Sequence, residues 1–232
     1  MKLQDARILL TGGSLGIGRE TAKVLVAAGA RVVITGRDAA RLRKAAGTTG
    51  AFAVVADVGN PDDIERTYQQ AMDHLGGLDC LINNAGISTF QELQAVTLDE
   101  FERTFRVNVY GPALMAARAV SIFKKQRSHG SIVNIGSTAA LKGFPGGTVY
   151  GASKFALRGM TECWQTELRK HNIRVMLINP SEVATAFFDG KEHEAAPNKL
   201  STAEIAHVIK SVLEMDDRGL IPELAVWATN PW

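Results

Sequence analysis

Short apolar runs alternate with longer amphipathic stretches along the chain. The unbroken apolar runs predict strands covered on both faces, at residues 7–10, 31–35, 51–56, 78–82, 131–135, 173–178 and 220–226. The amphipathic stretches predict helices at residues 19–28, 42–46, 61–75, 97–125, 148–170 and 201–214. This alternation predicts an α/β fold with a doubly wound, Rossmann-like parallel sheet of about seven strands and helices on both faces.

Capping residues mark where several of these helices begin. Asp38 precedes one of them, and Thr97 with Glu100 forms the pattern of a capping box. Pro61 stands in a first-turn position, where its missing N–H group costs nothing. Pro222 lies inside the last predicted strand, which we therefore expect to be irregular.

We expect one domain over residues 1–232, because no linker, repeat or low-complexity tract interrupts the alternation. One polar stretch, residues 189–199, separates the strand at 173–178 from the helix at 201–214. Such a connection is typical of a mobile surface loop, so we predict a substrate lid over residues 187–200.

A glycine-rich turn, Thr11-Gly12-Gly13-Ser14-Leu15-Gly16-Ile17-Gly18, follows the first predicted strand. Glycine permits a sharp turn and a close approach of the backbone to a pyrophosphate, and the helix that follows presents unpaired N–H groups to the phosphates. The spacing of Gly12, Gly16 and Gly18 differs from the commoner G-x-G-x-x-G pattern. The turn predicts a dinucleotide site, and an ordinary strand–helix turn is the alternative.

The end of the second predicted strand bears on the choice of nucleotide. NAD sites usually place a carboxylate there for the ribose hydroxyls, whereas this chain has Thr35-Gly36-Arg37. The Arg37 guanidinium suits a 2′-phosphate, which favours NADP(H) over NAD(H), and a solvated Arg37 is the alternative. Asp57 is a candidate acceptor for the adenine amino group, and Asn83-Asn84-Ala85-Gly86 places small residues along the cofactor.

Tyr150 and Lys154 are four residues apart on a predicted helix and so share one face. A nearby ammonium favours the phenolate, which predicts a lowered pKa for Tyr150 and a role in proton transfer. Ser137 follows the fifth predicted strand and precedes this pair. A lone tyrosine–lysine pair is more often a helix-surface pair without a role, so the interpretation depends on the accompanying motifs.

Together these motifs make the chain similar to the short-chain dehydrogenase/reductase family, of the single-domain type. They occur in the family's order and spacing over nearly the whole chain, and comprise Thr11-Gly12-Gly13-Ser14-Leu15-Gly16-Ile17-Gly18, Asn83-Asn84-Ala85-Gly86, Asn108, Ser137 and Tyr150-Gly151-Ala152-Ser153-Lys154. Two positions depart from the family's pattern. Ser181 stands where glycine commonly follows the proline, and Leu15 where many NADP-using relatives carry a basic residue.

The resemblance implies a role for each matching residue. Tyr150 would exchange a proton with the substrate oxygen while hydride passes to or from nicotinamide C4, and Ser137 would hold that oxygen. Lys154 would bind the nicotinamide ribose and tune Tyr150, and Asn108 would position a water in a proton relay to Lys154. The expected cofactor-binding residues are Gly12, Ser14, Leu15, Gly16, Ile17, Arg37, Asp57, Val58, Asn84, Ala85, Gly86, Tyr150, Lys154, Pro180, Val183 and Thr185.

Pro112 lies four residues after Asn108, within the predicted helix at 97–125. Because proline has no N–H group, the carbonyl of Asn108 loses the donor that an α-helix normally supplies, and Gly111 relaxes the helix at the same point. We expect the freed carbonyl to accept a hydrogen bond from water. The alternative is that Pro112 only bends the helix for packing.

A substrate pocket is expected beyond the carboxyl ends of the strands. Its expected walls are mostly apolar, which suits a carbonyl on a hydrophobic or acyl-like group, and comprise Ala139, Leu141, Phe144, Phe187 and Phe188. Lys142 would either face an acidic substrate tail or be solvated. No metal site is predicted, because His193 and His207 lack partners at metal-ligand spacing.

Composition narrows the partners and the compartment. The chain has 26 Lys and Arg residues against 24 Asp and Glu residues, a formal charge of +2, which predicts neither nucleic-acid nor membrane binding. Two cysteines without CxxC spacing, and an N-terminus unlike a secretion signal, predict a cytoplasmic location. The resemblance implies a homodimer or homotetramer built on the helices at 97–125 and 148–170.

These observations predict an NADPH-dependent ketone or 3-oxoacyl reductase, which interconverts a carbonyl and an alcohol of a small molecule. The alternative is a non-catalytic NADP(H)-sensing protein on the same fold, against which the intact Ser137, Tyr150 and Lys154 speak. A sugar epimerase or dehydratase is a third alternative, although such relatives are usually longer, with a larger substrate lobe.

Overall fold

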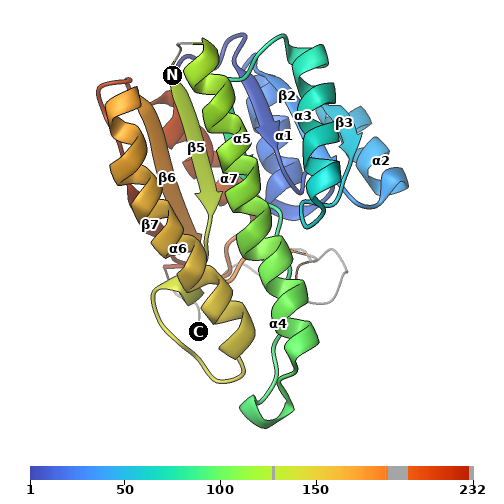
Figure 1. Ribbon diagram of the computed structural model, residues 1–232, viewed down its shortest axis with the longest axis vertical. Coiled ribbons are helices and arrows are strands. Elements are labelled where there is room, and N and C mark those ends of the chain that lie inside the picture. Colours follow the sequence, from blue (N-terminus) through green and yellow to red (C-terminus); the bar gives the residue numbers. More distant parts are fainter. Residues whose placement is uncertain (127–128, 186, 188–197, 230–232) are drawn as a thin grey trace.

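The computed structural model describes residues 1–126, 129–185, 187 and 198–229 (Figure 1). Most of the predicted lid over 187–200, together with the predicted pocket residue Phe188, lies outside these described residues. The described residues form one sheet that is covered by helices on both faces.

The sheet has seven parallel strands in the order β3-β2-β1-β4-β5-β6-β7. Their bounds are β1 Arg7–Leu10, β2 Arg31–Gly36, β3 Phe52–Val55, β4 Cys80–Asn83, β5 Gly130–Ile135, β6 Ile173–Pro180 and β7 Glu223–Val226. The order reverses at β1, which pairs with β2 on one side and β4 on the other. The predicted doubly wound parallel fold is confirmed, and a ligand cleft is expected at this reversal.

The α-helices of the described residues are α1 Gly16–Ala27, α2 Ala39–Thr49, α3 Pro61–Leu75, α4 Leu98–Phe105, α5 Gly111–Gln126, α6 Thr148–Leu168 and α7 Thr202–Glu214. Shorter helical turns are η1 Leu93–Ala95, η2 Arg106–Tyr110, η3 Thr138–Ala140 and η4 Arg169–His171. In Figure 1, α3, α5 and α6 lie in front of the sheet, and α1 and α7 lie behind it. Within the described part of the chain, no helix has the length and apolar character needed to cross a bilayer.

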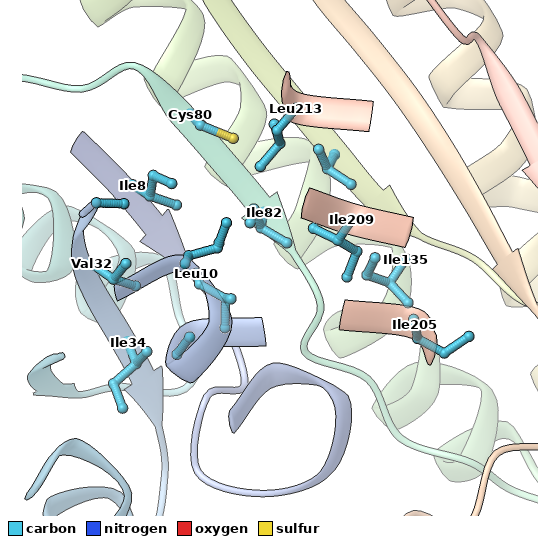
Figure 2. Packing of buried hydrophobic residues seen from close by; sticks show 14 of the residues in the cluster. Ile8, Leu10, Val32, Ile34, Cys80, Ile82, Ile135, Ile205, Ile209 and Leu213 are labelled. Carbon is cyan, nitrogen blue, oxygen red and sulfur yellow. The ribbon is translucent and has the colours of Figure 1, made fainter. Parts of the chain in front are cut away.

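Two apolar layers hold the helices to the sheet, because successive strand residues point to opposite faces. Ile8 and Leu10 of β1 pack in the layer beneath α1, α2 and α7, whereas Leu9 packs in the layer beneath α3, α5 and α6. Figure 2 shows the first of these layers, where Ile205 and Ile209 of α7 pack over the strands. Burial on both faces explains the unbroken apolar runs in the sequence.

Helix starts follow the predicted caps. The Asp38 carboxylate accepts a hydrogen bond from the Arg41 N–H at 2.9 Å at the start of α2. Thr97 and Glu100 form the predicted capping box of α4. At the other end of the sheet, β7 begins only at Glu223, because Pro222 cannot donate to the ladder.

The predicted helix at 97–125 is interrupted by a π-helical turn, η2, which separates α4 from α5. Gly111 N–H donates to the carbonyl of Arg106, five residues earlier, and Pro112 has no N–H to donate at all. The predicted helical stretch is confirmed, since α4, η2 and α5 follow one another without a break, but its middle is π-helical rather than α-helical. The π turn contains Asn108, which is buried. A water bound to the Asn108 carbonyl stays a prediction.

Candidate active site

Loops at the carboxyl ends of the strands enclose a cleft of about 1040 Å³. The structure brings all the expected cofactor-binding residues to its lining: Gly12, Ser14, Leu15, Gly16, Ile17, Arg37, Asp57, Val58, Asn84, Ala85, Gly86, Tyr150, Lys154, Pro180, Val183 and Thr185. Ser137 also lines the cleft, whereas Asn108 is buried outside its lining. Segments far apart in the sequence thus meet around one space.

The glycine-rich turn after β1 forms one wall of the cleft. Gly12 and Gly16 have φ angles of +71° and +56°, in the left-handed region that favours glycine. A Cβ on Gly18 would lie 2.2 Å from the carbonyl oxygen of Gly12, so a larger residue there would displace the backbone. The Asn84 amide donates to the carbonyls of Thr11 and Gly12 at 2.9 and 3.0 Å, which fixes the turn against the end of β4.

Charged side chains lie where β2 and β3 end. Arg37 and Arg41 are exposed and both line the cleft, and Arg41 pairs with Asp38 at 3.5 Å. The Asp57 carboxylate, also in the lining, accepts from the N–H of Gly59 at 2.9 Å. Two guanidinium groups at one edge of the cleft are suited to binding a phosphate group.

The cleft has the space and the donors for a dinucleotide. A Cβ on Gly16 would lie 3.3 Å from Thr185, and one on Gly86 would lie 3.8 Å from Lys154 Nζ, so glycine keeps both places open. Helix α1 begins without a side-chain cap, which leaves its first N–H groups available to phosphate oxygens. Among the described residues, no group of three or more His, Cys, Asp and Glu side chains is arranged to hold a metal ion.

Tyr150, Ser137 and Lys154 meet in another part of the cleft. The Ser137 side chain lies near enough to the Tyr150 hydroxyl to act as a hydrogen-bonding neighbour that lowers the pKa of Tyr150. Lys154 Nζ donates to the carbonyl of Ile135 at 2.9 Å and lies 5.8 Å from the centre of the Tyr150 ring. The tyrosine and the lysine are 7% and 4% exposed, so both polar groups lie largely outside bulk water.

Burial decides the proton affinities of this pair. It raises the pKa of Tyr150 to about 12, against the lowering effect of the Ser137 hydrogen bond. Burial also lowers the pKa of Lys154 to about 8. The prediction of a lowered pKa for Tyr150 is therefore wrong, because the cost of taking a phenolate out of water outweighs the favourable contacts around it.

Asn108 lies in the π turn, close to the helix that carries Tyr150. Its amide nitrogen donates to the Ile87 carbonyl at 2.9 Å and to the Ser153 hydroxyl at 3.0 Å. Its amide oxygen accepts from the Ile87 N–H at 2.9 Å. Ser153 in turn donates to the carbonyl of Tyr150 at 2.7 Å. Asn108 thus joins the loop after β4 to α6.

Aromatic rings surround Tyr150. The rings of Phe90 and Phe187 lie edge-on to it, with centroid distances of 5.3 and 5.8 Å. Phe144 lies 5.8 Å from Phe90 in turn. All three phenylalanines line the cleft, together with Ala139. This part of the cleft therefore presents an apolar, largely aromatic wall to a ligand that reaches the Tyr150 hydroxyl.

Sequence reasoning misplaced one wall residue and missed several residues that line the cleft. Leu141 is exposed at the end of η3 and does not line the cleft. Phe90, Trp227 and Arg41 line it although they were not expected there. Phe90 and Trp227 lie beyond the carboxyl ends of β4 and β7, and that position alone is a usable signal. Arg41 lies in the first turn of α2, four residues after Arg37.

Known proteins are similar to this chain in sequence and in fold. Residues 6–196 match the family described as short chain dehydrogenase. An L-xylulose reductase from Caenorhabditis elegans is 36% identical over 215 residues, which cover 92% of this chain and 85% of that protein. The 3-ketoacyl-(acyl-carrier-protein) reductase from Brucella melitensis, solved with NADH, has a TM-score of 0.91 at 28% identity, covering 99% of this chain and 100% of that one.

A second solved structure is a short chain dehydrogenase from Burkholderia cenocepacia in complex with NADP. It has a TM-score of 0.88 at 28% identity and covers 100% of this chain and 98% of that one. Sequence and fold thus agree over nearly the full length. The chain therefore belongs to the short-chain dehydrogenase/reductase family, as an oxidoreductase that binds a nicotinamide cofactor and interconverts carbonyl and alcohol groups of small molecules.

Proposed function

We propose that this protein is an NADPH-dependent reductase of ketones or 3-oxoacyl groups. The observation that carries the proposal is that Ser137 and the buried Tyr150 line the same cleft, whose β2 edge carries Arg37. The pair supplies a proton and a hydrogen-bond partner for a substrate oxygen, and the arginine supplies a partner for a phosphate.

Tyr150 donates the proton to the substrate oxygen in the reductive direction. A pKa of about 12 keeps the phenol protonated at neutral pH, as a general acid requires. Ser137 holds the same oxygen, because its side chain lines the cleft beside the phenol. When bound, the nicotinamide supplies the hydride from its C4 carbon. In the alcohol-oxidising direction the proton moves back to the tyrosine.

Lys154 and Asn108 support this proton transfer. With a pKa of about 8, Lys154 is mostly charged at neutral pH and can hold the nicotinamide ribose. Asn108 keeps α6 against the loop after β4 through Ser153 and Ile87, and it positions a water that relays protons toward Lys154.

The preference for NADP(H) over NAD(H) rests on Arg37, with Arg41 beside it in the cleft lining. Strand β2 ends at Gly36, so no carboxylate stands there to hold ribose hydroxyls or to repel a 2′-phosphate. The relative from Burkholderia cenocepacia was solved with NADP and the one from Brucella melitensis with NADH. The family fold thus accepts both nucleotides, and the charge at this edge makes the choice.

The substrate is apolar next to its carbonyl group. Phe90 and Phe187 lie edge-on to Tyr150 and Phe144 packs against Phe90, so the wall next to the Tyr150 hydroxyl is apolar. A ketone substrate, and with it the reductive direction, suits this apolar wall. The ketone oxygen needs hydrogen bonds only from the hydroxyls of Ser137 and Tyr150. A wall of this kind favours ketones on aromatic, alicyclic or acyl groups over polyols.

A homodimer or homotetramer is the proposed assembly. Tyr110, Leu114 and Phe155, on η2, α5 and α6, are large apolar residues with 56%, 46% and 45% of their surface exposed. Exposed apolar residues of this size are common at subunit interfaces. Light scattering coupled to size-exclusion chromatography gives the subunit number directly, and a monomer at micromolar concentration contradicts the proposal.

The proposed reaction is tested by following NADPH oxidation over a panel of cyclic diketones, aryl ketones, 3-oxoacyl thioesters and keto sugars. We expect turnover of the first three classes, with NADPH preferred to NADH. Tight NADPH binding without turnover of any carbonyl would instead favour the NADP(H)-sensing protein. Turnover confined to keto sugars would contradict the proposed substrate class.

A further inference from the structure

A chain of hydrogen bonds leads from the surface of α6 to the backbone of Ser137. The Arg158 guanidinium group donates hydrogen bonds of 2.9, 3.1 and 3.1 Å to the Glu223 carboxylate. Glu223 Oε1 accepts from the Asn179 amide at 2.7 Å, and Asn179 Oδ1 accepts from the Ser137 N–H at 3.1 Å. The four residues come from α6, β7, β6 and the segment after β5.

Asn179 is the buried member of this series of hydrogen bonds. Its amide side chain has only one orientation in which both its NH₂ group and its oxygen are hydrogen-bonded. Its side chain is 0% exposed, with its NH₂ group on a carboxylate and its oxygen on a backbone N–H. The site is shaped for this contact, since a Cβ on Gly136 would lie 2.1 Å from Asn179 Oδ1. An amide that is satisfied at both ends fixes the backbone it binds.

This series of hydrogen bonds begins on α6, the same helix that carries the proposed proton donor. Arg158 follows Tyr150 by eight residues and Lys154 by four on α6, a spacing that places all three on one side of the helix. Ser137 lines the cleft together with Tyr150, and its side chain lowers the pKa of the Tyr150 phenol. Helix α6 and Ser137 therefore face each other in the cleft and are also joined through Arg158, Glu223 and Asn179.

We propose that Asn179, Glu223 and Arg158 are positioning residues, which hold Ser137 at hydrogen-bonding distance from Tyr150. None of the three is among the residues assigned above to the reaction. This role rests on the proposed function of Ser137 and Tyr150. It also gives strand β7 a part in holding the active site. Strand β7 carries Glu223, so the last strand of the sheet helps to set the geometry of a site formed by earlier elements.

The test compares Glu223→Ala with Glu223→Gln, and uses Glu214→Ala as the control because Glu214 forms a half-exposed ion pair with Lys210 on α7. We expect Glu223→Ala to lower kcat for ketone reduction about tenfold, the effect of losing roughly 1.4 kcal/mol of positioning. The Kd for NADPH should stay within about twofold, because Glu223 does not line the cleft. Glu223→Gln should recover most of kcat, because its amide oxygen still accepts from Asn179.

A second readout does not depend on turnover. Hydrogen exchange at the Ser137 amide, followed by NMR, should be faster in Glu223→Ala and in the surface variant Arg158→Ala than in the wild type. The rising limb of the pH profile for alcohol oxidation should also move to higher pH, as in Ser137→Ala, because the Ser137 hydrogen bond lowers the pKa of Tyr150.

The outcomes separate this inference from the proposed function. Unchanged kcat and unchanged Ser137 exchange in both Glu223→Ala and Arg158→Ala would overturn the positioning role. A loss of kcat that Glu223→Gln does not rescue, accompanied by an equal loss of NADPH affinity, would mark a general structural defect and overturn it as well. A wild type without any carbonyl turnover would overturn the proposed function, while the exchange measurement would still decide whether the chain holds Ser137.

Discussion

The two ends of the cleft are built by different means. At the nucleotide end, the turn that faces the pyrophosphate makes room because Gly12, Gly16 and Gly18 lack side chains, and this turn offers backbone groups as contacts. At the chemical end, Ser137 and Tyr150 offer side chains that elements distant in the sequence hold in place. A local sequence run specifies the glycine turn, whereas the chemical end depends on the whole sheet being assembled.

The two ends also differ in their effect on stability. The chemical end buries Lys154, whose charge is disfavoured there strongly enough to lower its pKa to about 8. The glycine turn buries no charged side chain. The comparison teaches that the space for the cofactor costs mainly backbone entropy at the glycines, whereas the groups that move protons cost the desolvation of a buried charge.

Removing the Ser137 hydroxyl should separate chemistry from nucleotide binding. We expect Ser137→Ala to lower kcat about 100- to 1000-fold, the usual loss when one hydrogen bond to a reacting oxygen is removed. The Kd for NADPH should change by less than about twofold, since the glycine turn is intact. Ser121→Ala, on the exposed side of α5, is the control. A loss of NADPH binding equal to the loss of kcat would break the distinction between the two ends.

The stability cost of Lys154 should show in the pH dependence of unfolding. The folded-state pKa of about 8 lies below the usual value of 10.5, so the unfolded chain binds more protons between these pH values. The free energy of unfolding of the wild type should therefore rise as the pH increases from about 8 to about 10, by up to about 3 kcal/mol. Urea unfolding at several pH values measures the rise, which Lys154→Met should lack.

Lys23→Met is the matched control for that measurement, because Lys23 is 63% exposed in its side chain. It should keep the pH-dependent rise of the wild type. Above about pH 10 the raised pKa of Tyr150 acts in the opposite direction, since the unfolded chain then loses the tyrosine proton first. An identical rise in Lys154→Met and the wild type would show that the chemical end carries no such cost.

Filling the glycine turn should damage the nucleotide end selectively. A Cβ on Gly18 would meet the Gly12 carbonyl oxygen at 2.2 Å, so we expect Gly18→Ala to cost about 1–3 kcal/mol and to weaken NADPH binding about tenfold or more. Gly47→Ala in α2, where a Cβ would meet nothing within 4 Å, should instead stabilise the fold by about 0.5–1 kcal/mol. Calorimetric titration and urea unfolding measure both effects. Normal NADPH affinity in Gly18→Ala would contradict the proposed phosphate-binding turn.

Reversing the charge at Arg37 should change the preference between NADPH and NADH. This is the smallest effect among these predictions. We expect Arg37→Asp to shift the ratio of kcat/KM values toward NADH about tenfold, because a carboxylate repels a 2′-phosphate and accepts from ribose hydroxyls. Arg43→Asp should leave the ratio unchanged, because Arg43 lies on α2 but does not line the cleft. An unaltered ratio in Arg37→Asp would remove Arg37 from the site.

Most of the fold was predictable from the sequence, because strands buried on both faces leave unbroken apolar runs and helices leave capping residues. Leu9 between Ile8 and Leu10 illustrates the first case, and Asp38 the second. The π turn at Arg106–Tyr110 was not predicted as such. Pro112 signals only that a donor is missing, and packing in three dimensions decides how the helix accommodates the loss.

The candidate site was predictable as a set of residues but not in its energetics. The turn around Gly12 and the pair of Tyr150 and Lys154 stand in recognisable local patterns. The direction of the Tyr150 pKa shift depends on burial by residues such as Phe90 and Phe187, which no local pattern joins to it. The link from Asn179 to Ser137 likewise exists only once β5 and β6 pair.

The central claim is that the Tyr150 hydroxyl gives its proton to a substrate oxygen inside the nucleotide cleft. Steady-state NADPH oxidation with the best ketone of the panel, measured alongside the NADPH Kd, tests it in Tyr150→Phe and the wild type. The account predicts that Tyr150→Phe loses turnover by about 1000-fold or more while binding NADPH within about twofold of the wild type. Turnover within about tenfold of the wild type in Tyr150→Phe would contradict it.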